Sequence, residues 1–192
     1  PSQRFAKQLL ASLPFQLTAA QKRVSREILT DLKHNKPMLR LVQGDVGAGK
    51  TLVAALAACH ALEEGWQVAL MAPTEILAEQ HYLNFKKWFE PLGVQVAWLA
   101  GKQKGKARAA QEQNIQLGLA QLVVGTHALF QDSIQFAKLG LAIIDEQHRF
   151  GVDQRLSLRN KGIKNMTPHQ LVMTATPIPR TLAMSAYGDL DT

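Results

Sequence analysis

The feature that most constrains the fold is the glycine-rich segment from Gly44 to Thr51, which reads G-D-V-G-A-G-K-T and fits the pattern G-x-x-x-x-G-K-[ST]. The apolar run Met38 to Val42 before it predicts a short strand, and the alanine- and leucine-rich segment from Leu52 to Glu64 predicts a helix. Glycine at Gly44 and Gly49 lets backbone N–H groups turn inward around an anion, where a Cβ atom would obstruct them. A strand, this loop and a helix in that order predict a phosphate-binding P-loop within an α/β fold.

The types of residue in the P-loop predict how a nucleoside triphosphate is held. Lys50 can place a positive charge between the β- and γ-phosphates, and the hydroxyl of Thr51 can bind Mg²⁺. The N-terminus of the following helix adds a partial positive charge. The alternative is a glycine-rich turn with a chance lysine, which the flanking strand and helix disfavour. The predicted nucleotide-binding residues are Gly44, Asp45, Val46, Gly47, Ala48, Gly49, Lys50 and Thr51.

Short apolar runs recur along the rest of the chain and are separated by helical or mixed segments. This pattern is typical of a doubly wound α/β fold, in which helices cover both faces of a mainly parallel sheet. A helix near Arg4 to Leu10 and a second from Thr18, its N-cap, to about Lys33 are expected before the sheet. Since 46% of the 192 residues are apolar, we expect one compact domain. The expected strands are Met38–Val42, Val68–Ala72, Val94–Leu99, Gln121–Val124, Leu141–Ile144 and Leu171–Met173.

Charge and composition narrow the class of protein. The net charge of +7 favours a polyanionic partner. Basic residues gather between Lys102 and Arg108 and between Arg149 and Lys164, although either stretch could be a solvated charged face. The single cysteine, Cys59, excludes an internal disulfide and is expected to be a small core residue. No apolar stretch approaches the length of a membrane span and no leader pattern opens the chain, so we expect a soluble, cytoplasmic protein with no membrane partner.

A pair of carboxylates completes the predicted nucleotide site. Asp145 and Glu146 follow the apolar run Leu141–Ile144, so we expect them at the carboxyl end of the sheet, on the same edge as the P-loop. Asp145 can hold Mg²⁺, and Glu146 can act as the base that orients an attacking water. In isolation such a pair is usually only the start of a helix. The P-loop upstream favours the metal and base roles.

The pair continues as Asp145-Glu146-Gln147-His148, which resembles the DExH box of superfamily 2 helicases. Four more segments resemble motifs of that superfamily, in the same order along the chain. They are Leu17-Thr18-x-x-Gln21 (the adenine-reading Q motif), Ala72 to Gln80 (motif Ia), Gly125-Thr126-His127 (motif Ib) and Thr174-Ala175-Thr176 (motif III). The resemblance implies a RecA-like motor lobe that uses ATP and Mg²⁺.

The resemblance also implies roles for individual residues. Gln21 would select adenine, Lys50 and Glu146 would be catalytic, and Thr51 and Asp145 would bind the metal. Nucleic-acid backbone contacts would come from Pro73, Thr74, Gly101, Lys102, Gly125 and Thr126. Coupling between the phosphate state and the arrangement of lobes would involve Gln147, His148, Thr174, Ala175 and Thr176.

Several of these residues could instead have purely structural roles. Gln21 could be an ordinary exposed helical glutamine, and Thr74 could serve only as a helix N-cap. The threonines at Thr174 and Thr176 could cap a turn before Pro177. Phe15 could pack on the base, although an aromatic residue near the start of a domain is more often part of the core.

Three further segments narrow the resemblance to bacterial ATP-dependent translocases of branched or forked DNA: Gln147 to Val152, Thr174 to Thr181 and Ala186 to Asp191. This resemblance implies a helical extension over residues 1–14 and a helicase ATP-binding, first RecA-like domain over residues 15–192. It also implies partners elsewhere in a longer chain, namely a second RecA-like lobe with arginine fingers and a wedge domain. We therefore expect a piece of a longer protein, and an isolated lobe that hydrolyses ATP slowly at best.

Three functions are consistent with the sequence. The first is the motor lobe of a double-stranded-DNA translocase that remodels stalled replication forks. The second is a motor lobe of the same superfamily acting elsewhere, in transcription-repair coupling or on RNA. The third is a nucleotide-dependent binding module without turnover, which the presence of both Lys50 and Glu146 disfavours.

Overall fold

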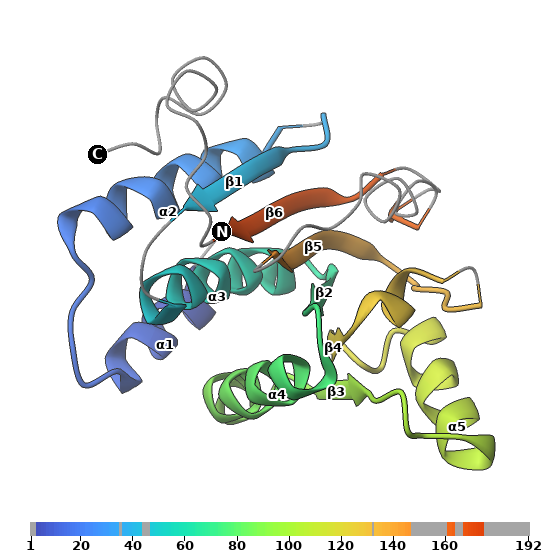
Figure 1. Ribbon diagram of the computed structural model, residues 1–192. Helices are drawn as coiled ribbons and strands as arrows, with labels where there is room; N and C mark the ends of the chain where they lie inside the picture. Colours follow the sequence, from blue (N-terminus) through green and yellow to red (C-terminus); the bar gives the residue numbers. More distant parts are fainter. Residues whose placement is uncertain are drawn as a thin grey trace.

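The computed structural model describes residues 3–34, 36–43, 47–131, 133–146, 161–163 and 167–174. Within these ranges a six-stranded sheet has the order β1-β6-β5-β2-β4-β3, and every neighbouring pair is parallel (Figure 1). The doubly wound α/β fold predicted from the sequence is confirmed. The strands are β1 (Leu39–Gln43), β2 (Gln67–Met71), β3 (Val96–Leu99), β4 (Leu122–Gly125), β5 (Leu139–Glu146) and β6 (His169–Thr174).

Helices cover both faces of the sheet, and the strands divide their side chains between two cores. In β2, Val68 and Leu70 pack in the core beneath α1 to α4, whereas Ala69 and Met71 pack in the core beneath α5 and η2. This alternation follows from the two-residue period of a strand, and both faces are apolar because both are covered. The helices are α1 (Arg4–Ser12), α2 (Ala19–Leu32), α3 (Gly47–Glu63), α4 (Glu75–Phe89), α5 (Gly105–Gln116), η1 (Glu90–Leu92) and η2 (His127–Phe130).

Local sequence signals explain where two of the helices begin. Thr18 is the N-cap of α2, as predicted, and its hydroxyl accepts a hydrogen bond from the backbone N–H of Gln21 (3.1 Å). Thr74 does the same for α4, accepting from Leu77 N–H at 3.2 Å. Each cap satisfies a backbone donor that the first helical turn leaves without a partner.

Several predicted boundaries differ from the structure, and two of the differences lie at the predicted nucleotide site. Strand β5 continues through Asp145 and Glu146, which were expected after its end, because β6 extends the parallel ladder alongside them. Helix α3 begins at Gly47, inside the P-loop, and not at Leu52. Cys59 lies in α3 with no exposed surface, so its predicted place in the core is confirmed.

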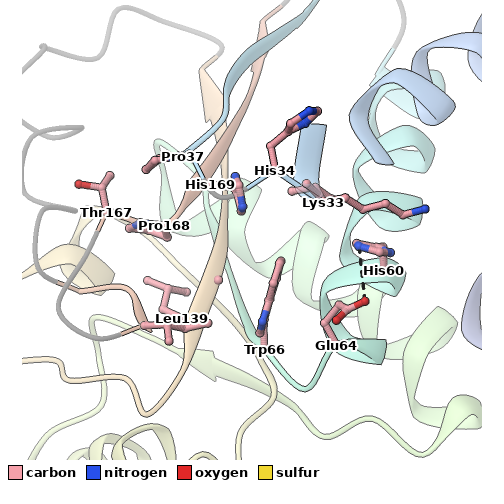
Figure 2. Close-up of a pocket in the computed structure, with 13 residues that line it drawn as sticks. Lys33, His34, Pro37, His60, Glu64, Trp66, Leu139, Thr167, Pro168 and His169 are labelled. Carbon is pink, nitrogen blue, oxygen red and sulfur yellow. Dashed lines mark ion pairs between the residues drawn. The ribbon is translucent and has the colours of Figure 1, made fainter. Parts of the chain in front are cut away.

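A cavity of about 430 Å³ lies at the amino-terminal ends of the strands, between the turn that precedes β2 and the start of β6 (Figure 2). Trp66 stacks on His169 with ring centroids 5.8 Å apart, and its indole lies so close to Gly140 that a Cβ atom there would be 2.5 Å from the ring. His169 Nδ1 accepts a hydrogen bond from Met38 N–H (2.8 Å). Burial lowers the pKa of both His60 and His169, which favours the neutral form of these two imidazoles in the cavity.

No helix within the described ranges is both long enough and apolar enough to cross a membrane.

Candidate nucleotide-binding site and nucleic-acid interface

The carboxyl ends of three strands bring the P-loop, the carboxylate pair and the predicted coupling threonine together. Gln43, which directly precedes the P-loop, pairs in register with Thr174 at the end of β6. Thr174 in turn pairs with Glu146 at the end of β5. Thr174 is buried and therefore lies between the strand that enters the phosphate loop and the strand that carries the proposed base.

A second cavity, also of about 430 Å³, opens at this edge and is lined by Lys50, Thr51 and Asp145. Lys50 and Asp145 are only 8% and 5% exposed, so both side chains are largely shielded from bulk water. A buried charge is costly unless partners or a ligand compensate it, and a triphosphate with a divalent cation would compensate both. The structure thus brings together the three side chains predicted to hold the phosphates and metal. Its remaining wall comes from Phe15, Leu52, Met173 and one face of α4 (Leu77, Gln80, His81, Asn84 and Trp88).

Gln21 lies against the P-loop from the start of α2. Its Oε1 accepts a hydrogen bond from Thr18 N–H (2.9 Å), which completes a reciprocal capping box with the Thr18 hydroxyl. A Cβ atom on Gly49 would lie 3.0 Å from Gln21 Nε2. The capping box therefore fixes the amide of Gln21 beside the phosphate loop, where an ordinary surface glutamine would be free to rotate.

Phe15 is not a core residue. It is 52% exposed and lines the cavity that contains Lys50 and Asp145. An exposed aromatic ring at the mouth of a cavity offers a face on which a planar base can stack. The alternative of a core aromatic, left open by the sequence, is wrong.

Asp145 has a partner that the sequence did not predict. His81, on α4, places Nε2 at 2.6 Å from Asp145 Oδ2, and both side chains are buried. The Nε2–H tautomer of His81 donates to an ionised Asp145 in this contact, since an ionised carboxylate can only accept hydrogen bonds. One carboxylate oxygen of Asp145 is thereby fixed, which leaves Oδ1 for other partners.

The loops after β2 and β3 form the adjoining part of the carboxyl edge. Gly101 N–H donates to Glu75 Oε1 (3.0 Å), and a Cβ atom on Gly101 would lie 2.7 Å from that oxygen. The glycine thus allows the loop after β3 to close onto the first turn of α4. Thr74 and Lys102 are exposed beside this contact.

The other predicted nucleic-acid residues are less accessible. Pro73 is half-buried, and Gly125 and Thr126 are buried. A Cβ atom on Gly125 would lie 3.1 Å from Leu99 O, so glycine is needed there for close packing of β4 against its neighbour. Exposure at this surface is concentrated at Thr74, Gly101 and Lys102.

The basic residues only partly form the charged surface that was expected. Lys102, Lys104 and Lys106 are exposed, but Arg108 is tied down, with Nη1 donating to Ala100 O (2.9 Å) and Nε to Glu112 (3.1 Å). Lys161 is buried, and Nζ donates to the carbonyl oxygens of Gln131 and Ile134 at 2.6 and 2.7 Å. Its predicted place on a solvated or DNA-facing surface is wrong, because it satisfies backbone acceptors in the interior. Arg149, Arg155, Arg159 and Lys164 lie outside the described residues.

Several predicted site residues lie wholly or partly outside the description. For Gly47, Ala48 and Glu146 only the backbone position is described, in α3 and β5. The residues outside the described ranges are Gly44, Asp45, Val46, Gln147, His148, Ala175 and Thr176. Their assigned roles stay predictions.

A family model for the DEAD/DEAH box helicases matches residues 18–185, from the N-cap of α2 to beyond motif III. The chain belongs to the DEAD/DEAH box helicase family. The helicase resemblance of the separate motifs is thereby confirmed over a continuous stretch that includes the P-loop and the carboxylate pair.

Within this helicase family, the chain is similar to proteins named ATP-dependent DNA helicase RecG. It is 67% identical to that of Haemophilus influenzae over 184 residues and 66% identical to that of Escherichia coli K12 over 185 residues. These alignments cover 95% and 96% of this chain but 27% of each relative. The chain therefore spans about a quarter of the length of these relatives, in agreement with the expected piece of a longer protein.

Solved structures agree with this family assignment. A structure of RecG bound to a three-way DNA junction is 45% identical, with a TM-score of 0.84, and the match covers 98% of this chain and 25% of that one. Dbp5 of S. cerevisiae, solved with RNA and ADP BeF3, matches over 99% of this chain and 48% of its own with a TM-score of 0.64. Its identity is 20%, so that similarity shows the fold alone.

The sequence did not predict the side chains that α4 contributes to the cavity at the carboxyl edge. Leu77, His81, Asn84 and Trp88 recur at spacings of three and four residues, which places them on one face of the helix. That spacing, counted from the motif Ia threonine, was the available signal. It could not show which strand the face meets, because that depends on the packing of α4 across the sheet.

Proposed function

We propose that this chain is the first motor lobe of an ATP-dependent double-stranded-DNA translocase, or helicase, which remodels stalled replication forks and branched DNA in repair and recombination. The observation that carries the proposal is one cavity at the carboxyl edge lined by Lys50, Thr51 and Asp145, together with the exposed residues Thr74 and Lys102 on loops of the same edge. The 67% identity to a protein named a DNA helicase favours DNA as the substrate. The same comparison favours this function over transcription-repair coupling, RNA unwinding or a passive binding module.

In this proposal ATP lies between the P-loop and the start of α2. The phosphates are held by Lys50 and by backbone N–H groups at the N-terminus of α3, whose dipole favours anions. The closeness of Gln21 Nε2 to Gly49 supports adenine recognition next to the loop, with the ring of Phe15 available for stacking. The other loop residues from Gly44 to Ala48 complete the phosphate cradle.

Mg²⁺ fits the donors that line the cavity. Thr51 offers a hydroxyl and Asp145 a carboxylate, and hard oxygen ligands of this kind, few in number and supplemented by phosphates and water, are what Mg²⁺ prefers. When bound, Mg²⁺ neutralises charge on the β- and γ-phosphates. Thr51 and Asp145 would hold it, and His81 occupies Oδ2 of Asp145.

Hydrolysis would be divided between this lobe and the remainder of a longer protein. Glu146 orients the attacking water, and the motif III residues Thr174, Ala175 and Thr176, with Gln147 and His148, relay the phosphate state. Arginine fingers from a second RecA-like lobe would contribute about 10³–10⁵-fold to turnover, so this lobe alone would be slow. A wedge domain of the same protein would engage the branch point.

DNA would lie on the loops after β2, β3 and β4 and would be bound through its phosphates. Thr74 at the N-terminus of α4 and Lys102 supply donors that recognise backbone without reading sequence. Pro73, Gly101, Gly125 and Thr126 shape this surface. A bacterial protein that acts on chromosomal DNA in this way would work in the cytoplasm.

The test uses the full-length protein with a synthetic three-way DNA junction. ATP hydrolysis and strand separation are measured for the wild type, Lys50→Ala and Lys33→Ala, since Lys33 is an exposed lysine at the other cavity. We expect Lys50→Ala to lose both activities and Lys33→Ala to keep them. Unchanged hydrolysis in Lys50→Ala would refute the motor function, and hydrolysis without any strand separation in the wild type would refute branched DNA as the substrate.

A further inference from the structure

The buried contact between His81 and Asp145 joins the DExH box to a residue that lies in none of the helicase segments identified above. It joins residues 64 positions apart, at 2.6 Å, in a cavity that both side chains line. His81 is 9% exposed and Asp145 5%, so water competes little for this hydrogen bond. A buried histidine on a carboxylate that is expected to bind metal is the arrangement in which an outer residue orients a ligand.

The position of His81 along α4 gives the contact a second consequence. Helix α4 begins at Glu75, directly after Thr74, and His81 lies seven positions beyond Thr74. Seven residues make about two helical turns, a rise of about 10 Å, so Thr74 and His81 lie on the same side of one rigid element. The same helix thus meets the proposed DNA surface at one end and Asp145 two turns further on.

Buried side chains hold helix α4 in the core over most of its length. Ala78, Phe85 and Phe89 have no exposed surface, and Phe85 stacks on Phe89 with centroids 5.7 Å apart. The ring of His81 packs edge-on against Phe85, at 6.4 Å between centroids. A close-packed helix moves as a unit because its interior contacts resist local bending.

We propose that His81 is a positioning residue that orients Asp145 for the magnesium nucleotide and links that orientation to DNA contact at the start of α4. The inference rests on the proposed function and deepens it. His81 donates to Oδ2 and so holds Oδ1 toward the cavity. DNA bound at Thr74 biases the position of α4, and the position of α4 sets the hydrogen bond. Because coupling between two sites is reciprocal, the magnesium nucleotide also changes DNA affinity through the same contact.

The experiment measures binding in the full-length protein, without turnover. A fluorescent, non-hydrolysable ATP analogue is titrated at a series of Mg²⁺ concentrations, and again in EDTA, for the wild type, His81→Leu, His81→Asn and His81→Gln. We expect His81→Leu and His81→Asn to raise the Mg²⁺ concentration needed for tight binding by about tenfold or more. His81→Gln, whose amide reaches as far as Nε2, should restore most of the affinity. Binding in EDTA should be equal in all four proteins.

A second readout addresses the link to DNA. The affinity for a three-way junction is measured with and without the magnesium analogue, and we expect the nucleotide to change it in the wild type and His81→Gln but not in His81→Asn. Lys87→Arg, an exposed change on the same helix outside the helicase motifs that keeps the charge, is the control and should behave as wild type. If His81→Leu fails to fold, the comparison of His81→Asn with His81→Gln carries the test.

The outcomes separate this inference from the function on which it rests. If the wild type binds the analogue in a Mg²⁺-dependent way but His81→Asn has the same Mg²⁺ requirement, the positioning role is wrong and the nucleotide site stands. If all variants lose binding equally, including His81→Gln, the histidine is structural and the inference is again wrong. If the wild type itself shows no Mg²⁺-dependent binding of the analogue, the proposed function is wrong, and the positioning role that rests on it is wrong as well.

Discussion

Two cavities of about 430 Å³ lie at opposite ends of the same sheet, and they differ in chemistry and not in size. The cavity at the amino-terminal ends is lined by Trp66 and by His60 and His169, whose pKa values burial lowers. Its polar groups are partly satisfied within the fold, since His169 already accepts from Met38 N–H. The cavity at the carboxyl ends instead carries a buried lysine and a buried carboxylate.

The difference teaches that volume alone does not mark the functional end of a parallel sheet. At the carboxyl ends each strand runs into the loop that follows it, so side chains from distant segments of the sequence converge there. At the amino-terminal ends the close fit of Trp66 on Gly140 fills space and stabilises the fold. Substitutions at the two ends should therefore have separable effects, on turnover at one end and on stability at the other.

The largest expected effect is at the carboxyl end. Glu146→Gln in the full-length protein should lower DNA-stimulated ATP hydrolysis by about 10²–10³-fold, because it removes the base while keeping the shape of the side chain. The affinity for the magnesium nucleotide should change little. Steady-state ATPase assays with a junction DNA, paired with equilibrium nucleotide binding, check this split, and an equal loss of binding and turnover would show that Glu146 serves the structure.

Next in size is a substitution at the amino-terminal end. Gly140→Ala should lower the free energy of unfolding by about 1–3 kcal/mol, because the added Cβ would meet the Trp66 ring and force a shift in a packed region. Hydrogen exchange of β5 and β6 amides in the full-length protein measures the loss. ATP hydrolysis per folded molecule should stay at the wild-type level, and a selective loss of turnover with unchanged exchange would contradict the division between the two ends.

The exposed lysines beside the carboxyl edge should have a smaller effect. Replacing Lys102, Lys104 and Lys106 with alanine should reduce the slope of log affinity for DNA against log salt by about 0.9 for each lysine that contacts a phosphate. Arg108→Ala is the contrasting variant, because its guanidinium is engaged by Ala100 O and Glu112. It should loosen the loop after β3. An unchanged slope in the triple variant would show that these lysines form a solvated face and do not contact DNA phosphates.

The smallest expected effect is a pH dependence of stability at the amino-terminal end. The folded state lowers the pKa of His169 from its ordinary value of 6.5, so the unfolded chain takes up the proton first. Stability should be fully present above pH 6.5 and should fall as the pH drops below that value toward the lowered pKa. His169→Asn, which can still accept from Met38 N–H, should show a shallower fall in hydrogen-exchange protection of β1 and β6 between pH 7 and 5. An identical fall in both proteins would show that groups other than His169 cause the pH dependence of stability.

Local sequence patterns were sufficient to predict the strands, two of the helix starts and the position of the P-loop. Alternating apolar runs predicted the strands, Thr18 and Thr74 predicted helix starts, and the P-loop pattern predicted the edge at which Lys50 and Asp145 meet. Each of these signals acts within a few residues of the chain, so no tertiary information was needed.

What the sequence could not supply depends on how distant elements pack. His81 meets Asp145 only because α4 crosses the sheet beside β5, and Phe15 reaches the cavity only because of how the segment before α2 is placed. Lys161 looks like a surface cation by composition, but backbone carbonyl groups of a separate segment hold it inside. The capping box at Thr18 could be predicted only in part. The spacing of Thr18 and Gln21 is a local sequence pattern, whereas the approach of Gln21 to Gly49 depends on how α2 packs.

The most direct test compares nucleotide binding when the lysine at each cavity is removed. The affinity of the full-length protein for a fluorescent ATP analogue with Mg²⁺ is measured for Lys50→Ala and for Lys33→Ala. Lys50→Ala should weaken binding by about tenfold or more, as expected for loss of a buried charge on phosphate, while Lys33→Ala should bind as the wild type does. Wild-type affinity in Lys50→Ala, or an equal loss in Lys33→Ala, would contradict the assignment of the nucleotide site to the carboxyl edge.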